Sequence, residues 1–141
     1  MVVIDVQNAR IGRVGTYAAK KLLEGEEVQI INAEEAVISG DPQYTLEKYN
    51  TRRQLQFKGN PEKSPYWPKV PDRFVKKLIR GMLPRKKATG REAYKKLRVY
   101  IGHPSEVKGE PIRIENAELG SLTKYVKVGR LCELLGYERK G

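Results

Sequence analysis

Residues 2–31 read VVIDVQNARIGRVGTYAAKKLLEGEEVQII and contain two short apolar runs, at residues 2–6 and 28–31. Between the runs, apolar residues recur at helical spacing until Gly25, a residue type that commonly follows the end of a helix. Short apolar runs of this kind are typical of strands buried on both faces of a parallel sheet. The stretch therefore predicts a strand, a helix that begins near Asn8, and a second strand, which together form a βαβ unit.

The same alternation continues through the rest of the chain. Further helices are predicted from Asp41-Pro42 onward, from Asp72 to Arg80, over residues 90–97 and around residues 131–135. Two more apolar runs, at residues 99–101 and 111–114, predict two more strands. The predicted fold class is α/β, with a small, mainly parallel sheet between helical layers. We expect one domain, residues 1–141, with a basic region at residues 51–104 inserted in the scaffold.

Positive charge is concentrated in that basic region. The chain has a net charge of +11, and residues 51–104 hold 16 Lys and Arg against three Asp and Glu. Such a density of like charge repels itself unless a polyanion neutralises it. With 39% hydrophobic residues the chain is too apolar to be disordered. The composition therefore predicts a folded scaffold that presents a nucleic-acid surface in its middle third.

Residues 58–71 contain four prolines and no regular hydrophobic period, which predicts a long, extended, basic loop. Tyr66 and Trp67 lie in this loop between Lys63 and Lys69 and are suited to stack on unpaired bases or sugars. A tryptophan that pins the loop onto its own domain explains the pattern equally well. Both interpretations stay open at this point.

The most specific motifs lie between residues 81 and 104. They are Gly81-Met82-Leu83-Pro84, Gly90-Arg91, Leu97-Arg98-Val99-Tyr100 and Gly102-His103-Pro104, with supporting pieces at Asn8-Ala9, Gly12-Arg13, Ile31-Asn32-Ala33 and Ser39-Gly40. In this order they resemble the large-subunit ribosomal protein thirteen (L-thirteen) family over most of residues 2–137. The short segment after Gly102, with Tyr125-Val126 and Leu134-Leu135-Gly136, resembles the archaeal and eukaryotic branch. The absence of a long C-terminal extension favours the archaeal type.

This resemblance implies a four-stranded sheet in a three-layer α/β/α arrangement. It also implies a structural constituent of the large ribosomal subunit, in the cytoplasm, that binds large-subunit ribosomal RNA, contacts neighbouring ribosomal proteins and supports subunit assembly and translation. We expect Lys and Arg side chains to neutralise closely spaced phosphates and to recognise RNA shape rather than sequence.

The candidate RNA-binding residues are basic side chains of the middle third and the two loop aromatics. The first choices are Arg85, Lys86, Lys87 and Arg91, because nearby glycines and a proline allow close backbone approach and a defined turn. The second rank consists of Arg52, Arg53, Lys58, Lys76, Lys77, Arg80, Lys95, Lys96 and Arg98, together with Tyr66 and Trp67.

Gly12 and Gly15 lie where the first strand would meet the helix, as glycines do in dinucleotide-binding loops. The first glycine of Gly-x-Gly-x-x-Gly is missing, and Arg10 and Arg13 would crowd a pyrophosphate. We therefore expect the glycines to allow close packing of helix and sheet. The two arginines are expected to be solvated or to face RNA.

Catalytic patterns are missing from the sequence, and we expect no enzyme, cofactor, metal site, small-molecule substrate or membrane partner. His103 is the only histidine and precedes a proline, which indicates a turn residue rather than a general base. Cys132 is interpreted as a small helix residue, and Glu34 and Glu35 are expected to face solvent. Two alternative functions remain: a free regulatory RNA-binding protein, and a small α/β enzyme that acts on an anionic substrate.

Overall fold

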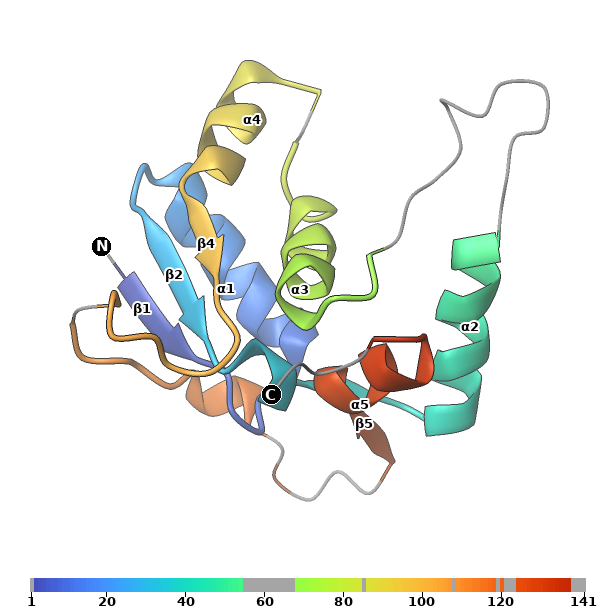
Figure 1. The fold of residues 1–141 in the computed structure, drawn as a ribbon. Coiled ribbons are helices and arrows are strands. Elements are labelled where there is room, and N and C mark those ends of the chain that lie inside the picture. The colour runs from blue at the N-terminus through green and yellow to red at the C-terminus, as the bar shows by residue number, and fades with distance from the viewer. Residues whose placement is uncertain are drawn as a thin grey trace.

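The computed structural model describes residues 2–54, 68–84, 86–107, 109–118, 120 and 124–137, with the backbone alone at residues 53 and 54. These residues form a mixture of helices and strands, as Figure 1 shows. In chain order they are β1 (Val2–Asp5), α1 (Ile11–Leu23), β2 (Val28–Ile31), the 3₁₀ helix η1 (Ala33–Glu35), β3 (Val37–Ser39), α2 (Pro42–Gln54), α3 (Pro71–Arg80), α4 (Ala88–Lys95), β4 (Leu97–Val99), the 3₁₀ helix η3 (Glu115–Ala117), β5 (Tyr125–Lys127) and α5 (Val128–Leu134).

The strands β1, β2 and β4 form a parallel sheet in that order. Val2 pairs with Val28, and Val28 pairs with Leu97, so the three strands lie side by side (Figure 1). Helix α1 connects β1 to β2, which confirms the predicted βαβ unit. The helix begins at Ile11 rather than near Asn8, because Asn8 adopts a left-handed backbone with a φ of 58°.

Strand β4 begins two residues before the run that we predicted at residues 99–101. Its first residue, Leu97, is completely buried, whereas Ile101 is only partly buried. The N–H of Tyr100 still donates to the carbonyl of Ile30, at 2.8 Å, before the chain leaves the sheet. Burial against the helices, rather than the density of apolar residues, thus determines where this strand lies.

The fourth predicted strand, at residues 111–114, is a single bridge between Ile112 and Ile4. The N–H of Ile112 donates to the carbonyl of Val3 at 2.8 Å, and the N–H of Asp5 donates to the carbonyl of Ile112 at 2.9 Å. Pro111 has no N–H with which to extend the ladder on one side. Among the described residues the parallel sheet therefore has three strands and not the four that we expected.

The helical layer covers one face of the sheet. Ile4 and Ile30 point into a core that they share with Val14 of α1, Phe74 of α3 and Ala93 of α4. The other face carries the alternate residues of the strands and packs against the segment that follows β4. There, Val3, Ile31 and Val107 form a second, smaller cluster. In the described part of the chain, an irregular segment thus takes the place of the second helical layer in the three-layer arrangement that we expected.

A second sheet, which the sequence analysis did not predict, joins β3 to β5 in antiparallel fashion. Helix α5 follows β5 directly, as Figure 1 shows, and buries Leu131 and Cys132. The interpretation of Cys132 as a small helix residue is therefore confirmed. Helix α5 also approaches η1, where a Cβ atom added to Gly129 would lie 3.0 Å from the carbonyl oxygen of Glu34.

Helices α2 and α3 begin with proline. The Asp41 side chain accepts a hydrogen bond from the N–H of Gln43 at 2.9 Å, which confirms the predicted cap of α2. Helix α3 begins at Pro71, one residue before the helical cap that we expected at Asp72. No helix in the described residues is long and apolar enough to cross a membrane.

Candidate nucleic-acid interface

Helix α3 buries one side and presents cations on the other. Phe74, Val75 and Ile79 are completely buried against the core. Lys76 and Arg80, one turn apart, lie on the other side of the helix and approach α4. The apolar and basic residues of this short helix therefore separate onto two faces, as the sequence predicted.

Tyr94 of α4 contacts two cations of α3. The Nζ atom of Lys76 lies 4.9 Å from the centre of the Tyr94 ring, and the guanidinium carbon of Arg80 lies 5.9 Å from it. Both distances suit cation–π attraction. The tyrosine therefore holds two positive side chains of α3 beside α4, and no local sequence pattern indicated this contact between two helices.

The charge on Lys76 is unfavourable for the fold. Partial burial lowers the pKa of its ammonium below the ordinary value of 10.5, the nearby Arg98 lowers this pKa further, and Asp72 opposes the shift. A lowered lysine pKa means that the folded state disfavours the charged form relative to the unfolded chain. The attraction of an anionic partner at this position would offset both the desolvation and the repulsion.

The turn after α3 and the first turns of α4 carry further predicted residues. Lys86, Lys87, Arg91 and Lys95 are all exposed, and none of them makes an ion pair with a described carboxylate. Lys87, Arg91 and Lys95 recur every four residues and so project from the same side of α4. The hydrogen bond from the Lys87 N–H to the Pro84 carbonyl, at 2.9 Å, closes the turn that brings them there.

We use the term α3–α4 surface for the described candidate residues of α3, of the turn after it and of α4, together with Arg98 of β4. It consists of Lys76, Lys77, Arg80, Lys86, Lys87, Arg91, Lys95 and Arg98. Five other candidates cannot be added to it. Arg85, Lys58, Tyr66, Trp67 and the side chain of Arg53 lie outside the described residues.

The remaining two candidates lie elsewhere. The ammonium of Lys96 donates to the carbonyl of Gly25, at 3.2 Å, at the C-terminal end of α1, where a cation complements the helix dipole. Arg52 lies on α2, with its guanidinium carbon 5.3 Å from the centre of the Tyr49 ring. Lys48 approaches the same ring at 5.5 Å. We did not predict Lys48, although its spacing of four residues from Arg52 places the two on one side of the helix.

Tyr49 anchors α2 on the domain. Its ring packs edge-on against Phe74, with the ring centres 4.9 Å apart, and is almost fully buried. Burial raises the pKa of its hydroxyl above the ordinary value, while Arg52 lowers that pKa. The tyrosine is therefore neutral at physiological pH and connects the cations of α2 to the core that supports α3.

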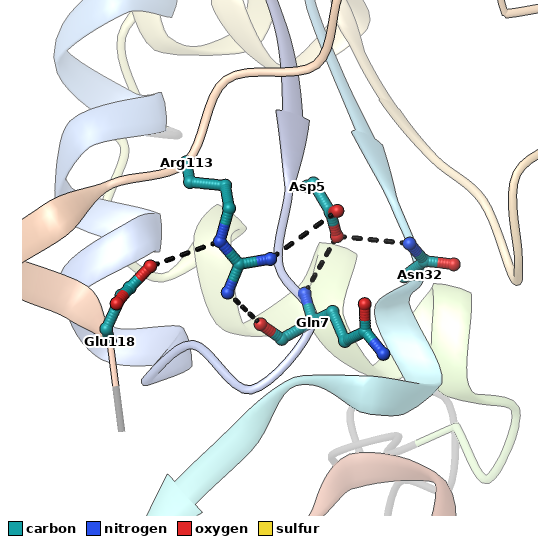
Figure 2. Close-up of polar contacts among 5 residues, drawn as sticks. All are labelled: Asp5, Gln7, Asn32, Arg113 and Glu118. Atoms are coloured by element: carbon teal, nitrogen blue, oxygen red, sulfur yellow. Dashed lines mark hydrogen bonds and ion pairs between the residues drawn. The ribbon is translucent and has the colours of Figure 1, made fainter. Parts of the chain in front are cut away.

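A second polar site lies at the carboxyl ends of β1 and β2, where open parallel sheets commonly bind ligands. Figure 2 shows that Arg113 fills this position. Its Nη2 donates to the carbonyl of Gln7 at 2.7 Å, its Nε lies 3.1 Å from Glu118 Oε1, and its Nη1 lies 3.5 Å from Asp5 Oδ2. Asp5 also accepts hydrogen bonds from the N–H of Gln7, at 2.9 Å, and from the side chain of Asn32, at 3.0 Å. We call these five residues the sheet-end cluster.

Two acids that we expected to face solvent have structural partners. The N–H of Gly102 donates to both oxygens of the Glu34 carboxylate, at 3.0 and 3.2 Å. The ammonium of Lys127 lies 2.6 Å from Glu35 and forms an ion pair with it. The expectation for Glu34 and Glu35 was therefore wrong, because their partners, Gly102 and Lys127 of β5, lie far along the chain. Both acids are only partly exposed.

The fold and the site together define a basic α/β domain. Its own side chains occupy the carboxyl ends of β1 and β2, and exposed cations gather on α3 and α4. A family model described as Ribosomal protein L13 matches residues 1–106. The chain therefore belongs to the ribosomal protein L13 family, whose members are structural proteins and not enzymes.

Relatives described as large ribosomal subunit protein uL13 match almost the whole chain. The protein of Methanosarcina barkeri is 45% identical over 96% of this chain and 98% of its own length. The protein of Methanopyrus kandleri is 41% identical over 99% of this chain and 89% of its own. The protein of Methanococcus maripaludis is 42% identical over 96% of this chain and 98% of its own. These relatives are archaeal, which agrees with the archaeal type suggested by the sequence motifs.

Proposed function

We propose that this member of the ribosomal protein L13 family is a constituent of the large ribosomal subunit that binds large-subunit ribosomal RNA through the α3–α4 surface. The observation that carries the proposal is that Lys86, Lys87 and Arg91 are exposed and make no ion pair with a described carboxylate. The printed names of the relatives, as proteins of the large ribosomal subunit, support the same conclusion.

The mechanism is neutralisation of closely spaced phosphates. Each Lys or Arg that contacts a phosphate releases condensed counterions, and this release favours binding in a way that depends on salt. Phosphate contacts position the protein without reading bases, so the surface recognises how RNA helices converge rather than a base sequence. By fixing that arrangement, the chain supports subunit assembly, and it does so as one domain. In the cytoplasmic ribosome it lies next to other ribosomal proteins.

The sheet-end cluster argues against the alternative of a small enzyme. In an α/β enzyme the carboxyl ends of the strands form a crevice for the substrate. Here Arg113 occupies that position and is bound by Asp5, Gln7 and Glu118. A free regulatory RNA-binding protein would use the same cations, and the location of the protein in the cell distinguishes it from a ribosomal component.

The test is sucrose-gradient fractionation of native cell extract at moderate salt, with the protein quantified in every fraction and the gradient repeated after ribonuclease treatment. The proposal expects about one copy per large subunit and loss of co-sedimentation once the RNA is digested. A protein that stays at the top of both gradients would contradict it.

A further inference from the structure

A groove of about 470 Å³ opens beside the first turn of α1. Strand β3 forms one wall, Tyr49 of α2 lies at one side, and Leu78 and Met82 lie opposite. The volume falls in the range of pockets that hold small organic groups. The candidate RNA-binding residues include none of the residues that line this groove, although Arg10 and Arg13 were expected to be solvated or to face RNA.

The walls of the groove are apolar and its rim is cationic. Val37, Ile38 and Leu78 supply aliphatic surface, and Arg10 and Arg13 are the charged residues of the lining. No Asp or Glu is present among the described residues that line it. The groove therefore suits a ligand with a flat apolar part and a negative charge. Its two arginines repel cations more than they repel an acidic peptide.

Met82 forms part of one wall of this groove. It is 40% exposed, and it lies so close to α1 that a Cβ atom added to Gly15 would come within 2.8 Å of its sulfur. The expectation that Gly12 and Gly15 allow close packing of helix and sheet was therefore wrong: Gly15 allows α1 to approach the end of α3, and Gly12 has no atom within 4 Å of an added Cβ. A flexible, polarizable methionine in that position can fit against surfaces of varied shape, including the face of a base.

The groove lies beside cations of α2. Leu78, which lines the groove, projects from the side of α3 opposite to Lys76 and Arg80 of the α3–α4 surface. Tyr49, on the other side, has Arg52 and Lys48 next to its ring. An RNA strand that follows the cations of α2 would pass the mouth of the groove.

We propose that this groove binds one unstacked nucleotide of the ribosomal RNA, with the base against the apolar walls and the phosphate beside Arg10 and Arg13. The proposal rests on the proposed function and deepens it. Arg13 is exposed and uses one guanidinium nitrogen, Nη1, to donate to the carbonyl of Asn116 at 2.5 Å. A guanidinium has five N–H donors, so this contact orients Arg13 and still allows it to bind a phosphate. Unpaired bases in RNA are commonly recognised by such insertion into protein pockets.

Gly12 provides a clean way to fill the groove. It lines the groove, is exposed, and has no atom within 4 Å of the position that a Cβ atom would occupy. The variant Gly12→Phe therefore places a ring in the groove without displacing the core. Gly12→Ala is the matched control, because it changes the backbone in the same way and leaves the groove open.

The probe is protein-free large-subunit ribosomal RNA, with affinity measured by filter binding and base accessibility measured by chemical modification. We expect Gly12→Phe to bind about tenfold more weakly than Gly12→Ala, which is the loss of one stacked base. One unpaired base that wild type and Gly12→Ala protect should become reactive with Gly12→Phe. A second pair provides an independent check: Ser39→Glu adds a negative charge to the lining, and Ser39→Gln does not.

Equal affinities and equal base reactivities for Gly12→Phe and Gly12→Ala would overturn the inference while leaving the proposed function intact. The same holds if Gly12→Phe instead weakens the attachment of a neighbouring protein in reconstituted subunits, since the groove would then hold a protein segment. A wild-type chain that does not bind the RNA would refute the proposed function itself, and the inference with it.

Discussion

The sheet-end cluster and the α3–α4 surface use the same kinds of cation in opposite ways. Arg113 contacts two carboxylates and a backbone carbonyl of its own chain. Lys86, Lys87 and Arg91 contact no described carboxylate, and the charge of Lys76 is disfavoured by burial and by Arg98. Cations of the first kind stabilise the fold, whereas cations of the second kind depend on a partner for their counter-charge.

The largest effect should follow from reversing charge on the α3–α4 surface. The variant with Lys86→Glu, Lys87→Glu and Arg91→Glu should lose affinity for large-subunit ribosomal RNA by about 1,000-fold or more, since a charge-assisted hydrogen bond contributes ~1.5–3 kcal/mol. Filter binding measures the loss. Its unfolding temperature should stay near the wild-type value, because these side chains are exposed. A variant that folds and still binds tightly would exclude this surface.

Removing the cation of the sheet-end cluster should have the opposite pattern. Arg113→Met should lower the free energy of unfolding by about 1–2 kcal/mol, because the carbonyl of Gln7 and two carboxylates lose their partner. The side chain of Arg113 is 40% exposed, so water compensates part of the loss. Urea denaturation measures this change. RNA affinity should be unaltered, and a large loss of binding would show that Arg113 belongs to the interface after all.

The smallest effect concerns Lys76. Lys76→Met should raise the free energy of unfolding at neutral pH, because it removes a partly buried charge. The gain should be at most about 0.5 kcal/mol, because solvent screens the exposed part of the side chain. The lowered pKa makes the wild-type folded state lose its proton before the unfolded chain does, so wild-type stability rises with pH through that window. The advantage of the variant should therefore disappear as the pH approaches 10.5.

Urea denaturation of both proteins between pH 7 and pH 10 tests the Lys76 prediction. The same substitution should weaken RNA binding by about tenfold, since one phosphate contact is lost. Lys76→Arg serves as the control that keeps the charge. If Lys76→Met proved strongly destabilising at pH 7, Lys76 would belong with Arg113 among the cations that hold the fold.

Local patterns were enough to predict the βαβ unit, the cap of α2 and the basic region. These features depend on residues a few positions apart, such as Asp41 and Gln43, or on composition. The charge imbalance of residues 51–104 likewise indicated the cations that the structure places on α3 and α4. For this kind of feature, spacing along the chain carries the necessary physical information.

Features made by distant residues could not be read in this way. Arg113 and Gln7 are 106 positions apart, and Glu34 and Gly102 are 68 apart. A charged residue next to an apolar run looks the same whether it meets solvent, a carboxylate or RNA. The one-residue bridge at Ile112 has a similar cause, because the apolar run predicted a strand while Pro111 and the contacts of Arg113 ended the pairing.

The central claim is that cations of the α3–α4 surface meet RNA phosphates, and the salt dependence of binding tests it most directly. The test variant is Lys86→Ala, Lys87→Ala and Arg91→Ala. The matched control is Lys124→Ala, Lys127→Ala and Arg130→Ala, which removes the same charge from the β5–α5 end of the molecule, away from α4 in Figure 1. Affinity for large-subunit ribosomal RNA is measured over a range of salt concentrations for both variants and for the wild-type chain.

We expect the slope of log affinity against log salt to be shallower by roughly 2 to 3 in the test variant, since each lost phosphate contact removes ~0.7–0.9. The control should keep a slope close to that of the wild type. Equal changes of slope in the two variants would show that only net charge matters and would contradict the assignment of the interface to α3 and α4.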